Sequence, residues 1–199
     1  MVIKNAEFIT SAADEKNFLS FDKPVIAVAG RSNVGKSSFI NMLANKNKLA
    51  KTSNTPGRTR LINYFDFGEF VIADLPGYGF AKVSKAEKEK WARLMEKYFE
   101  KSRIAHVFLL LDVRRKPTEE DVAMINYLYH YAHPFTLIAT KTDKLGKSKI
   151  KPEIKNIANC LKVGEGNVIG VSSVSKYGKD SVLDKLDTII SVYKEGEKV

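Results

Sequence analysis

The stretch GRSNVGKSSF, residues 30–39, decides how the chain folds. It matches the pattern G-x-x-x-x-G-K-[ST], in which glycines let the backbone curl so that successive N–H groups point at one spot. An apolar run, PVIAVAG (24–30), precedes it, and a pattern of helical period follows. A strand, a glycine loop and a helix in this order predict a phosphate-binding loop. Lys36 would then reach the β- and γ-phosphates, and the Ser37 hydroxyl would ligate Mg²⁺.

The length and composition describe a single globular domain. The chain has 199 residues, 44% of them hydrophobic, and no apolar run approaches the roughly 18 residues of a membrane helix. Residues 1–16 lack a continuous apolar core, so they do not resemble a secretory leader. The one cysteine, Cys160, cannot form an internal disulfide, and its helical spacing predicts a small buried side chain. Together these features favour a cytoplasmic protein.

Short apolar runs alternate with longer segments of helical period. The runs that suit strands buried on both faces of a mostly parallel sheet are residues 24–30, 69–74, 105–113, 134–140 and 167–173. Residues 61–74 fit a hairpin, which adds one antiparallel strand. The pattern predicts an α/β fold: a doubly wound, mostly parallel six-stranded sheet with helices on both faces. We expect a peripheral N-terminal extension at 1–23, the main domain at 24–194 and a tail at 195–199.

The segments of helical period are residues 36–46, 84–99, 118–132, 152–162 and 180–193. Ser84 and Glu87 predict a capping box at the start of the second segment. Apolar residues at three- and four-residue steps predict the buried face of that helix, at Trp91, Leu94, Met95, Tyr98 and Phe99. The same spacing predicts that four residues of the next helix face inward: Val122, Ile125, Leu128 and Tyr129.

The stretch DLPGYG (74–79) closes one of the apolar runs. An aspartate at that strand end lies beside the phosphate loop, where Asp74 can hold Mg²⁺ through water and the Gly77 N–H can face a γ-phosphate. An ordinary β-turn would also use these residue types. The interpretation as a magnesium and phosphate contact therefore depends on the position of the stretch at the strand end.

Two later strand ends predict a base-binding edge. TKTD (140–143) ends one run, at the carboxyl edge where such sheets bind ligands. The carboxylate of Asp143 can accept two hydrogen bonds from the N1–H and the exocyclic amine of guanine, a pair that adenine does not offer. Lys141 would lay its methylenes along the base. VSSVSKYG (171–178) ends the last strand, where backbone N–H groups around Ser173 could face guanine O6.

The series GRSNVGKS, TPGRTR, DLPGYG, TKTD and VSS, in this order, resembles a translation-factor-class GTPase. More narrowly, the chain resembles the EngB family of ribosome-assembly P-loop GTPases. The particular matches are GRSNVGKSSFIN, KTSNTPGRTRLINYF, and DLPGYGFAKVSK followed by the tryptophan helix. The resemblance covers nearly the whole chain, including the N-terminal NAEFITSA.

The resemblance implies a GTP-binding and GTP-hydrolysing switch. Thr59 would be the switch I threonine on Mg²⁺, with Thr55 as its competitor, and Asp74 and Gly77 would belong to switch II. The implied catalytic residues are Lys36, Thr59 and Gly77, and the implied Mg²⁺ ligands are Ser37, Thr59 and Asp74. The implied GTP- and GDP-binding residues are Gly30, Arg31, Ser32, Asn33, Val34, Gly35, Lys36, Ser37, Ser38, Pro56, Gly57, Arg58, Thr59, Asp74, Leu75, Pro76, Gly77, Thr140, Lys141, Thr142, Asp143, Ser172, Ser173 and Val174.

Two positions depart from the common GTPase pattern. Thr140 stands where many GTPases have asparagine, so the tie between the base site and the phosphate loop is weaker or is remade by the threonine hydroxyl. Tyr78 stands where Ras-like enzymes carry the glutamine that orients water, so we expect slow intrinsic hydrolysis that a partner or an ion accelerates. In related GTPases, an asparagine at the position of Asn33 ligates K⁺; the alternative donors of positive charge are Arg31, Arg58 and Arg60.

The net charge of +10, from 33 basic and 23 acidic residues, fits either a polyanionic partner or ordinary solubility. Basic residues gather in three places: Lys46, Lys48, Lys51, Arg58 and Arg60; Arg114, Arg115 and Lys116; and Lys144, Lys147, Lys149, Lys151 and Lys155. The resemblance implies the large ribosomal subunit, its rRNA and its proteins, as partner, with no membrane or DNA contact and a monomeric state. The alternatives are a metabolic P-loop ATPase or kinase, and an RNA-binding module that ignores nucleotide.

Overall fold

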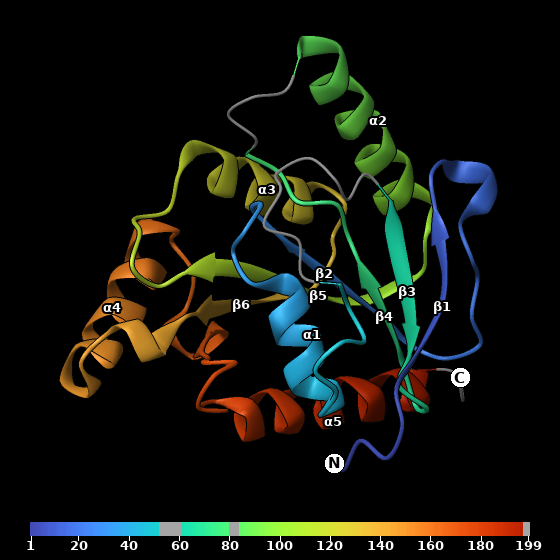
Figure 1. Cartoon of the computed structure of the whole chain (residues 1–199). Helices are drawn as coiled ribbons and strands as arrows, with labels where there is room; N and C mark the ends of the chain where they lie inside the picture. The colour runs from blue at the N-terminus through green and yellow to red at the C-terminus, as the bar shows by residue number, and fades with distance from the viewer. Residues whose placement is uncertain (52–60, 80–83, 197–199) are drawn as a thin grey trace.

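The computed structural model describes residues 1–51, 61–79 and 84–196. Within them, seven strands form one sheet in the order β1-β3-β4-β2-β5-β6-β7 (Figure 1). The strands are β1 (Glu7–Ala12), β2 (Val25–Gly30), β3 (Ile62–Asp66), β4 (Val71–Asp74), β5 (Ile104–Asp112), β6 (Phe135–Thr140) and β7 (Val168–Gly170). The α-helices are α1 (Lys36–Ala44), α2 (Lys85–Lys101), α3 (Glu119–His130), α4 (Lys147–Cys160) and α5 (Lys179–Gly196).

The centre of the sheet is parallel. β2 pairs in parallel with both β4 and β5, and β5, β6 and β7 continue in the same direction. The carboxyl ends of these five strands therefore meet at one edge of the sheet, where α/β folds bind ligands. β3 pairs antiparallel with β4, which confirms the hairpin expected at 61–74. The α/β class and the doubly wound, mostly parallel sheet are confirmed as well.

The strand count of six is wrong, because the N-terminal extension supplies a seventh. β1 pairs antiparallel with β3 and forms an edge of the sheet, with an irregularity in register between Phe8 and Thr10. Its burial is incomplete: Phe8 and Ile9 are exposed, whereas Ala12 is fully buried. An edge strand with one mostly open face lacks the continuous apolar run by which the inner strands are recognised. The division of the chain at residue 24 stays a prediction.

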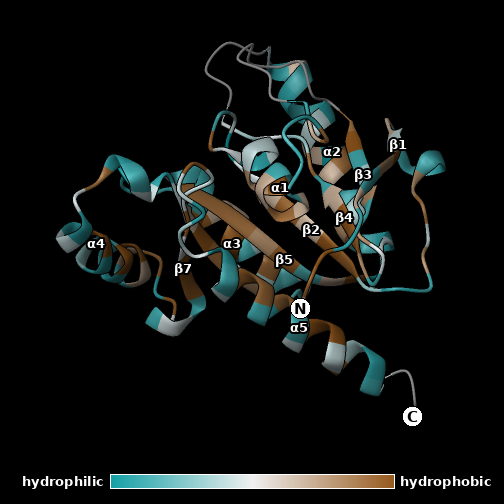
Figure 2. Cartoon of the chain, turned by 60° about the horizontal axis from the view of Figure 1, so that its bottom comes forward, coloured by the Kyte–Doolittle hydropathy of each residue, from teal (hydrophilic) through white to brown (hydrophobic). Residues whose placement is uncertain are grey.

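Helices cover both faces of the sheet, and each face has its own core. Alternate residues of β2 show the division: Val25 and Ala27 pack with α2, α3 and α4, whereas Ile26 and Val28 pack with α1 and α5. Figure 2 shows hydrophobic residues along the central strands and hydrophilic ones on the outward sides of the helices. No helix in the described ranges is long and apolar enough to cross a bilayer.

The buried face of α2 is confirmed, since Met95, Tyr98 and Phe99 are buried and Trp91 and Leu94 pack partly buried against the same core. The expected capping box is present at Ser84 and Glu87.

For α3 the predicted face is wrong at two positions. Val122 and Tyr129 are exposed, because the inward line runs through Asp121, Met124, Ile125 and Leu128. Because one residue of the buried face is an aspartate, Asp121, the spacing of apolar residues alone does not indicate this face.

Two further expectations near α4 are corrected. The helix begins at Lys147 rather than at 152, so Pro152 lies inside it instead of at its first turn. Pro152 removes one N–H donor from the early turns of the helix, and Ile150, two residues before it, is buried. Cys160 is exposed, not a buried filler, because Ile157, Ala158 and Leu161 provide the apolar contacts at this end of the helix.

Candidate functional site

The phosphate loop has the backbone that its glycines predict. Gly30 has φ +153° and Gly35 has φ +111°, and α1 begins directly after Gly35. A side chain at Gly30 would lie 2.8 Å from the Leu110 carbonyl oxygen and 2.9 Å from Val34 Cγ1, so only glycine fits between the loop and β5. The first turn of α1 holds no acidic residue, and its positive end therefore faces the loop without a carboxylate of its own helix.

Lys36 and Asp74 lie together at the end of the loop. The Lys36 ammonium is 3.5 Å from the Gly30 carbonyl oxygen. Burial lowers the pKa of Lys36, and the charge of Asp74 opposes that effect. Burial raises the pKa of Asp74 to about 6, again against the opposite charge of Lys36. Asp74 Oδ1 has no hydrogen-bond partner among the described residues, so a buried carboxylate oxygen is left for a further ligand.

The segment after β4 lies along the phosphate loop. Leu75 N donates to Val28 O at 3.0 Å, and Ser32 N donates to Tyr78 O at 2.9 Å. Gly77 lies between these two hydrogen bonds, close against the phosphate loop. A side-chain carbon at this position would be 3.0 Å from both Lys36 Nζ and Ser32 N. The indole N–H of Trp91 donates to Pro76 O at 3.0 Å, which fastens the segment to α2.

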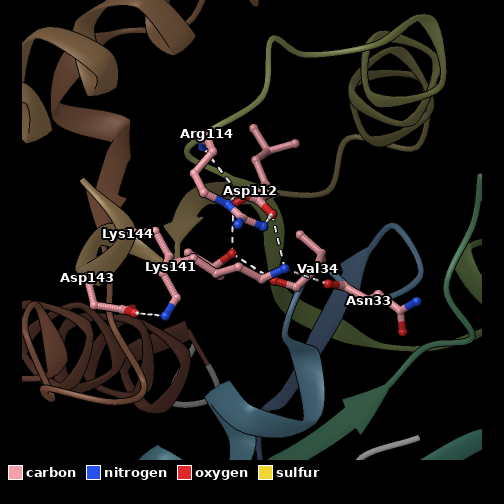
Figure 3. A network of polar contacts seen from close by, with 9 residues as sticks. Asn33, Val34, Asp112, Arg114, Lys141, Asp143 and Lys144 are labelled. Atoms are coloured by element: carbon pink, nitrogen blue, oxygen red, sulfur yellow. Dashed lines mark hydrogen bonds and ion pairs between the residues drawn. The ribbon is translucent and has the colours of Figure 1, made fainter. Parts of the chain in front are cut away.

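Thr140 ties the carboxyl end of β6 to the phosphate loop. Its hydroxyl lies 2.7 Å from Val34 O and 2.9 Å from Leu111 O, and it donates to one of them at a time because it carries one proton. The neighbouring Lys141, at φ +64°, donates from its ammonium to Asn33 O at 2.8 Å. Two neighbouring side chains at the end of β6 therefore contact two carbonyls of the loop, and Figure 3 shows Lys141 reaching towards Asn33.

Asp143 is oriented by the last strand end. Ser172 Oγ donates to Asp143 Oδ1 at 2.8 Å, while Val174 N and Ser175 N donate to Ser172 Oγ at 3.2 and 3.1 Å. Burial alone would raise the pKa of Asp143, but the hydrogen bonds from Ser172 and Lys144 bring it below its ordinary value. The carboxylate is therefore ionised at neutral pH and ready to accept hydrogen bonds.

The remaining base-edge residues differ in exposure. Ser172 and Thr142 are buried, Ser173 is half-buried, and Val174 is 80% exposed.

One residue of this edge was missed in the sequence. Asp112, at the end of β5, accepts from the Lys141 ammonium at 3.0 Å and from Arg114 Nε and an Arg114 terminal nitrogen at 2.9 and 2.7 Å (Figure 3). Burial would raise the pKa of Asp112, yet these two cations hold it well below its usual range. The available signal was an aspartate at the end of the 105–113 run, a position equivalent to that of Asp74.

Six of the expected residues lie outside the described ranges: Thr55, Pro56, Gly57, Arg58, Thr59 and Arg60. The others gather along the carboxyl edge of the sheet, from β4 through β2 to β6 and β7. The arrangement offers an ammonium and a curled loop at one end and an oriented carboxylate at the other. Such a pair can hold a phosphate chain and a base that presents two N–H donors.

The chain matches a family model described as 50S ribosome-binding GTPase over residues 25–141. It is 45% identical to the probable GTP-binding protein EngB of Clostridium kluyveri over 196 residues, which cover 97% of this chain and 100% of that protein. It is 49% identical to the probable GTP-binding protein EngB of Mycoplasma capricolum subsp. capricolum over 181 residues, covering 88% and 91% of the two chains.

Solved structures agree at the level of fold. A crystal structure of a probable GTP-binding protein engB superposes with a TM-score of 0.65 at 22% identity, covering 84% of this chain and 98% of that one. The crystal structure of Era in complex with MgGDPNP and nucleotides 1506–1542 of 16S ribosomal RNA also superposes with a TM-score of 0.65, at 20% identity. The match covers 82% of this chain and 55% of that one. The full-length relatives and the family model carry the conclusion beyond fold: the chain belongs to the EngB family of GTP-binding GTPases.

Proposed function

We propose that this GTPase is a switch that binds Mg·GTP at the carboxyl edge of its sheet and assists assembly of the large ribosomal subunit. The observation that carries the proposal is the placement of Lys36 and Asp74 at one end of this edge and of Asp143 at the other. The phosphate loop would hold the phosphates, and Lys36 would neutralise their charge. Asp143 would select guanine, with Lys141 along the base.

The magnesium ion fits the residues at the phosphate end. Asp74 supplies a buried carboxylate oxygen without a hydrogen-bond partner among the described residues, and Ser37 lies in the first turn of α1. Oxygen ligands of this kind are those that Mg²⁺ prefers. Ser37 would hold the ion directly and Asp74 through water, and when bound the ion would offset phosphate charge. Thr59, the third proposed ligand, lies outside the described residues.

Support for a ribosomal partner comes from likeness and from charge. The family model is described as ribosome-binding, and the structural neighbour Era was solved with ribosomal RNA. This chain carries a net charge of +10, and four exposed lysines of α4 form no ion pair with another described residue: Lys147, Lys149, Lys151 and Lys155. An excess of unpaired cations suits contact with RNA phosphates. Such a partner supports a cytoplasmic location as well.

Sedimentation with purified large subunits tests the partner. With a non-hydrolysable GTP analogue the protein should co-migrate with the subunits, and with GDP it should be released, because only the γ-phosphate holds the switch segments. Asp143→Ala is the matched control, since it should lose the response to guanine nucleotide while keeping its basic surface. Co-migration that is the same with either nucleotide, or none at all, would contradict the assignment and, in the first case, favour nucleotide-independent RNA binding.

Potassium stimulation through Asn33 is part of the proposal. The Asn33 side chain is exposed, and its backbone oxygen already accepts from Lys141. Hydrolysis should be faster in KCl than in NaCl at equal ionic strength. Equal rates would remove the role.

A further inference from the structure

The tyrosine in the usual place of the water-orienting glutamine is buried and engaged. The side chain of Tyr78 is 5% exposed, and its hydroxyl donates to Asp121 Oδ1, on α3, at 2.8 Å. Burial, together with the charge and hydrogen bond of Asp121, raises the pKa of Tyr78 well above its ordinary value, so the hydroxyl remains a donor. A hydroxyl that is committed to a protein carboxylate does not orient attacking water. The hydroxyl instead joins the segment after β4 to α3.

Asp121 is itself fixed in place. It is 3% exposed, and its second oxygen, Oδ2, accepts from Thr118 N at 2.8 Å and from Thr118 Oγ1 at 3.0 Å. These bonds belong to the capping box at the start of α3. Because both carboxylate oxygens accept hydrogen bonds and the side chain is buried, Asp121 is a fixed acceptor for the Tyr78 hydroxyl.

The main chain of Tyr78 is attached to the phosphate loop on its other side. Tyr78 O accepts from Ser32 N at 2.9 Å, and Tyr78 N donates to Gly30 O at 3.4 Å. The preceding residue, Gly77, is so close to Lys36 Nζ that a side-chain carbon would be 3.0 Å from it. Asp121 therefore holds Tyr78, and through it Gly77, beside Lys36, the residue proposed to meet the β- and γ-phosphates.

The phosphate loop is held by the same turn of α3. Arg31 donates from its guanidinium to Thr118 Oγ1 at 2.9 Å and lies 3.7 Å from Glu120. Gly79, at φ +73°, packs on that guanidinium, where a side-chain carbon would be 2.6 Å from Arg31 Nε. The first turn of α3 is thus the common support of the loop and of the segment after β4.

We propose that Tyr78 and Asp121 are positioning residues that hold Gly77 where its N–H meets the γ-phosphate, so that they favour triphosphate over diphosphate. This inference rests on the proposed function of the site. An N–H that is already in place has less conformational freedom to lose when the γ-phosphate arrives. The β-phosphate is bound by the loop, whose own bond to α3 runs from Arg31 to Thr118 and does not involve Tyr78, so the affinity for GDP should not depend on the bond between Tyr78 and Asp121.

The test is Tyr78→Phe, which removes the hydroxyl and keeps the ring. Calorimetry with β,γ-imido-GTP and with GDP should show the triphosphate analogue weakened about five- to tenfold, as expected for the net contribution of one hydrogen bond, while the GDP affinity changes less than twofold. Tyr98→Phe is the matched control, because Tyr98 is likewise a buried tyrosine, but its ring packs against Phe18 and Tyr64 rather than on the phosphate loop. That variant should bind both nucleotides like the wild type.

A substitution at Asp121, the acceptor of the Tyr78 hydrogen bond, separates the loss of this bond from a general loss of folding. Asp121→Asn keeps the shape of the side chain but replaces one carboxylate oxygen by an amide nitrogen. This variant should also bind β,γ-imido-GTP more weakly than the wild type, by a smaller factor than Tyr78→Phe, and its affinity for GDP should be unchanged. Equal losses for analogue and GDP, or no loss of either, would overturn the inference. A failure of this kind would leave guanine binding through Asp143 untouched, so it is distinguishable from a failure of the proposed site.

Discussion

At the scale of single residues, the hydroxyl of Thr140 joins the end of β6 to the phosphate loop, 106 residues away in the chain. It is buried, and its partners are backbone carbonyls of the phosphate loop and of β5. Thr140→Val keeps the shape and removes the donor, which leaves a buried carbonyl unsatisfied. We expect a loss of about 1–2 kcal/mol in the free energy of unfolding and a weaker affinity for GDP.

Urea titration and calorimetry measure the two effects. Thr140→Ser is the control, because it retains the hydroxyl and should keep most of the GDP affinity. If the valine and serine variants bound GDP alike, the tie through Thr140 would have no part in holding the site.

His106, on β5, gives a pH dependence at the same scale. It is buried against Phe108, its Nε2 lies 2.9 Å from Thr136 Oγ1, and burial, with a smaller contribution from Lys185, lowers its pKa to about 4. Since the unfolded chain takes up this proton near pH 6.5, stability from a neutral His106 is present above that pH and is lost as the pH falls towards 4.

Comparison with His106→Gln isolates the effect from the other titrating groups. Between pH 7.5 and pH 5 the wild type should lose about 2 kcal/mol more of its free energy of unfolding than the glutamine variant does. Parallel curves for the two proteins would show that His106 titrates normally in the folded state.

At the scale of elements, a buried lysine links α5 to α1, the helix that begins at Lys36. The Lys179 ammonium donates to Met42 O at 2.7 Å and to Asn45 Oδ1 at 2.6 Å, at the C-terminal end of α1. Met42 O also accepts from Asn45 N, the residue that caps α1, so Lys179 adds a charged donor to this helix end.

Lys179→Met keeps the length of the side chain and removes the donors. We expect a loss of about 1–3 kcal/mol in the free energy of unfolding, measured by chemical denaturation, because the buried Met42 carbonyl and the Asn45 side chain lose a charged donor. Lys155→Met, at an exposed position of α4, should change stability by less than about 0.5 kcal/mol. Equal effects of the two substitutions would contradict the assigned role of Lys179.

The elements also show where sequence reasoning succeeds. The inner strands and the hairpin could be predicted, because strands buried on both faces leave continuous apolar runs, as in VIAVAG and FTLIAT. β1 could not be recognised in this way, since an edge strand alternates weakly and its pairing with β3 is made by backbone groups. The register of α3 failed for a related reason: a buried Asp121 interrupts the apolar line that marks a packed face.

At the scale of the whole molecule, the strand ends supply the site because the fold brings distant segments to one edge. The positions of Asp74 and Thr140–Asp143 along that edge followed from the order of motifs and the parallel sheet. Partners that no motif encodes could not be foreseen. Asp112 holds Lys141 from the neighbouring strand, and Tyr78 meets Asp121 across 43 residues of chain. Such pairs are set by packing, which spacing along the sequence does not record.

The central claim is that these strand ends hold a guanine nucleotide through Asp143, and base selectivity measures it most directly. Calorimetry should show that the wild type binds GDP and GTP and leaves ATP unbound. Asp143→Asn keeps a carbonyl for Ser172 but loses the double acceptor for guanine, so GDP should weaken about a hundredfold while xanthosine diphosphate gains. A wild type that binds ATP as tightly as GTP, or a variant that still prefers GDP to the xanthine nucleotide, would contradict the account.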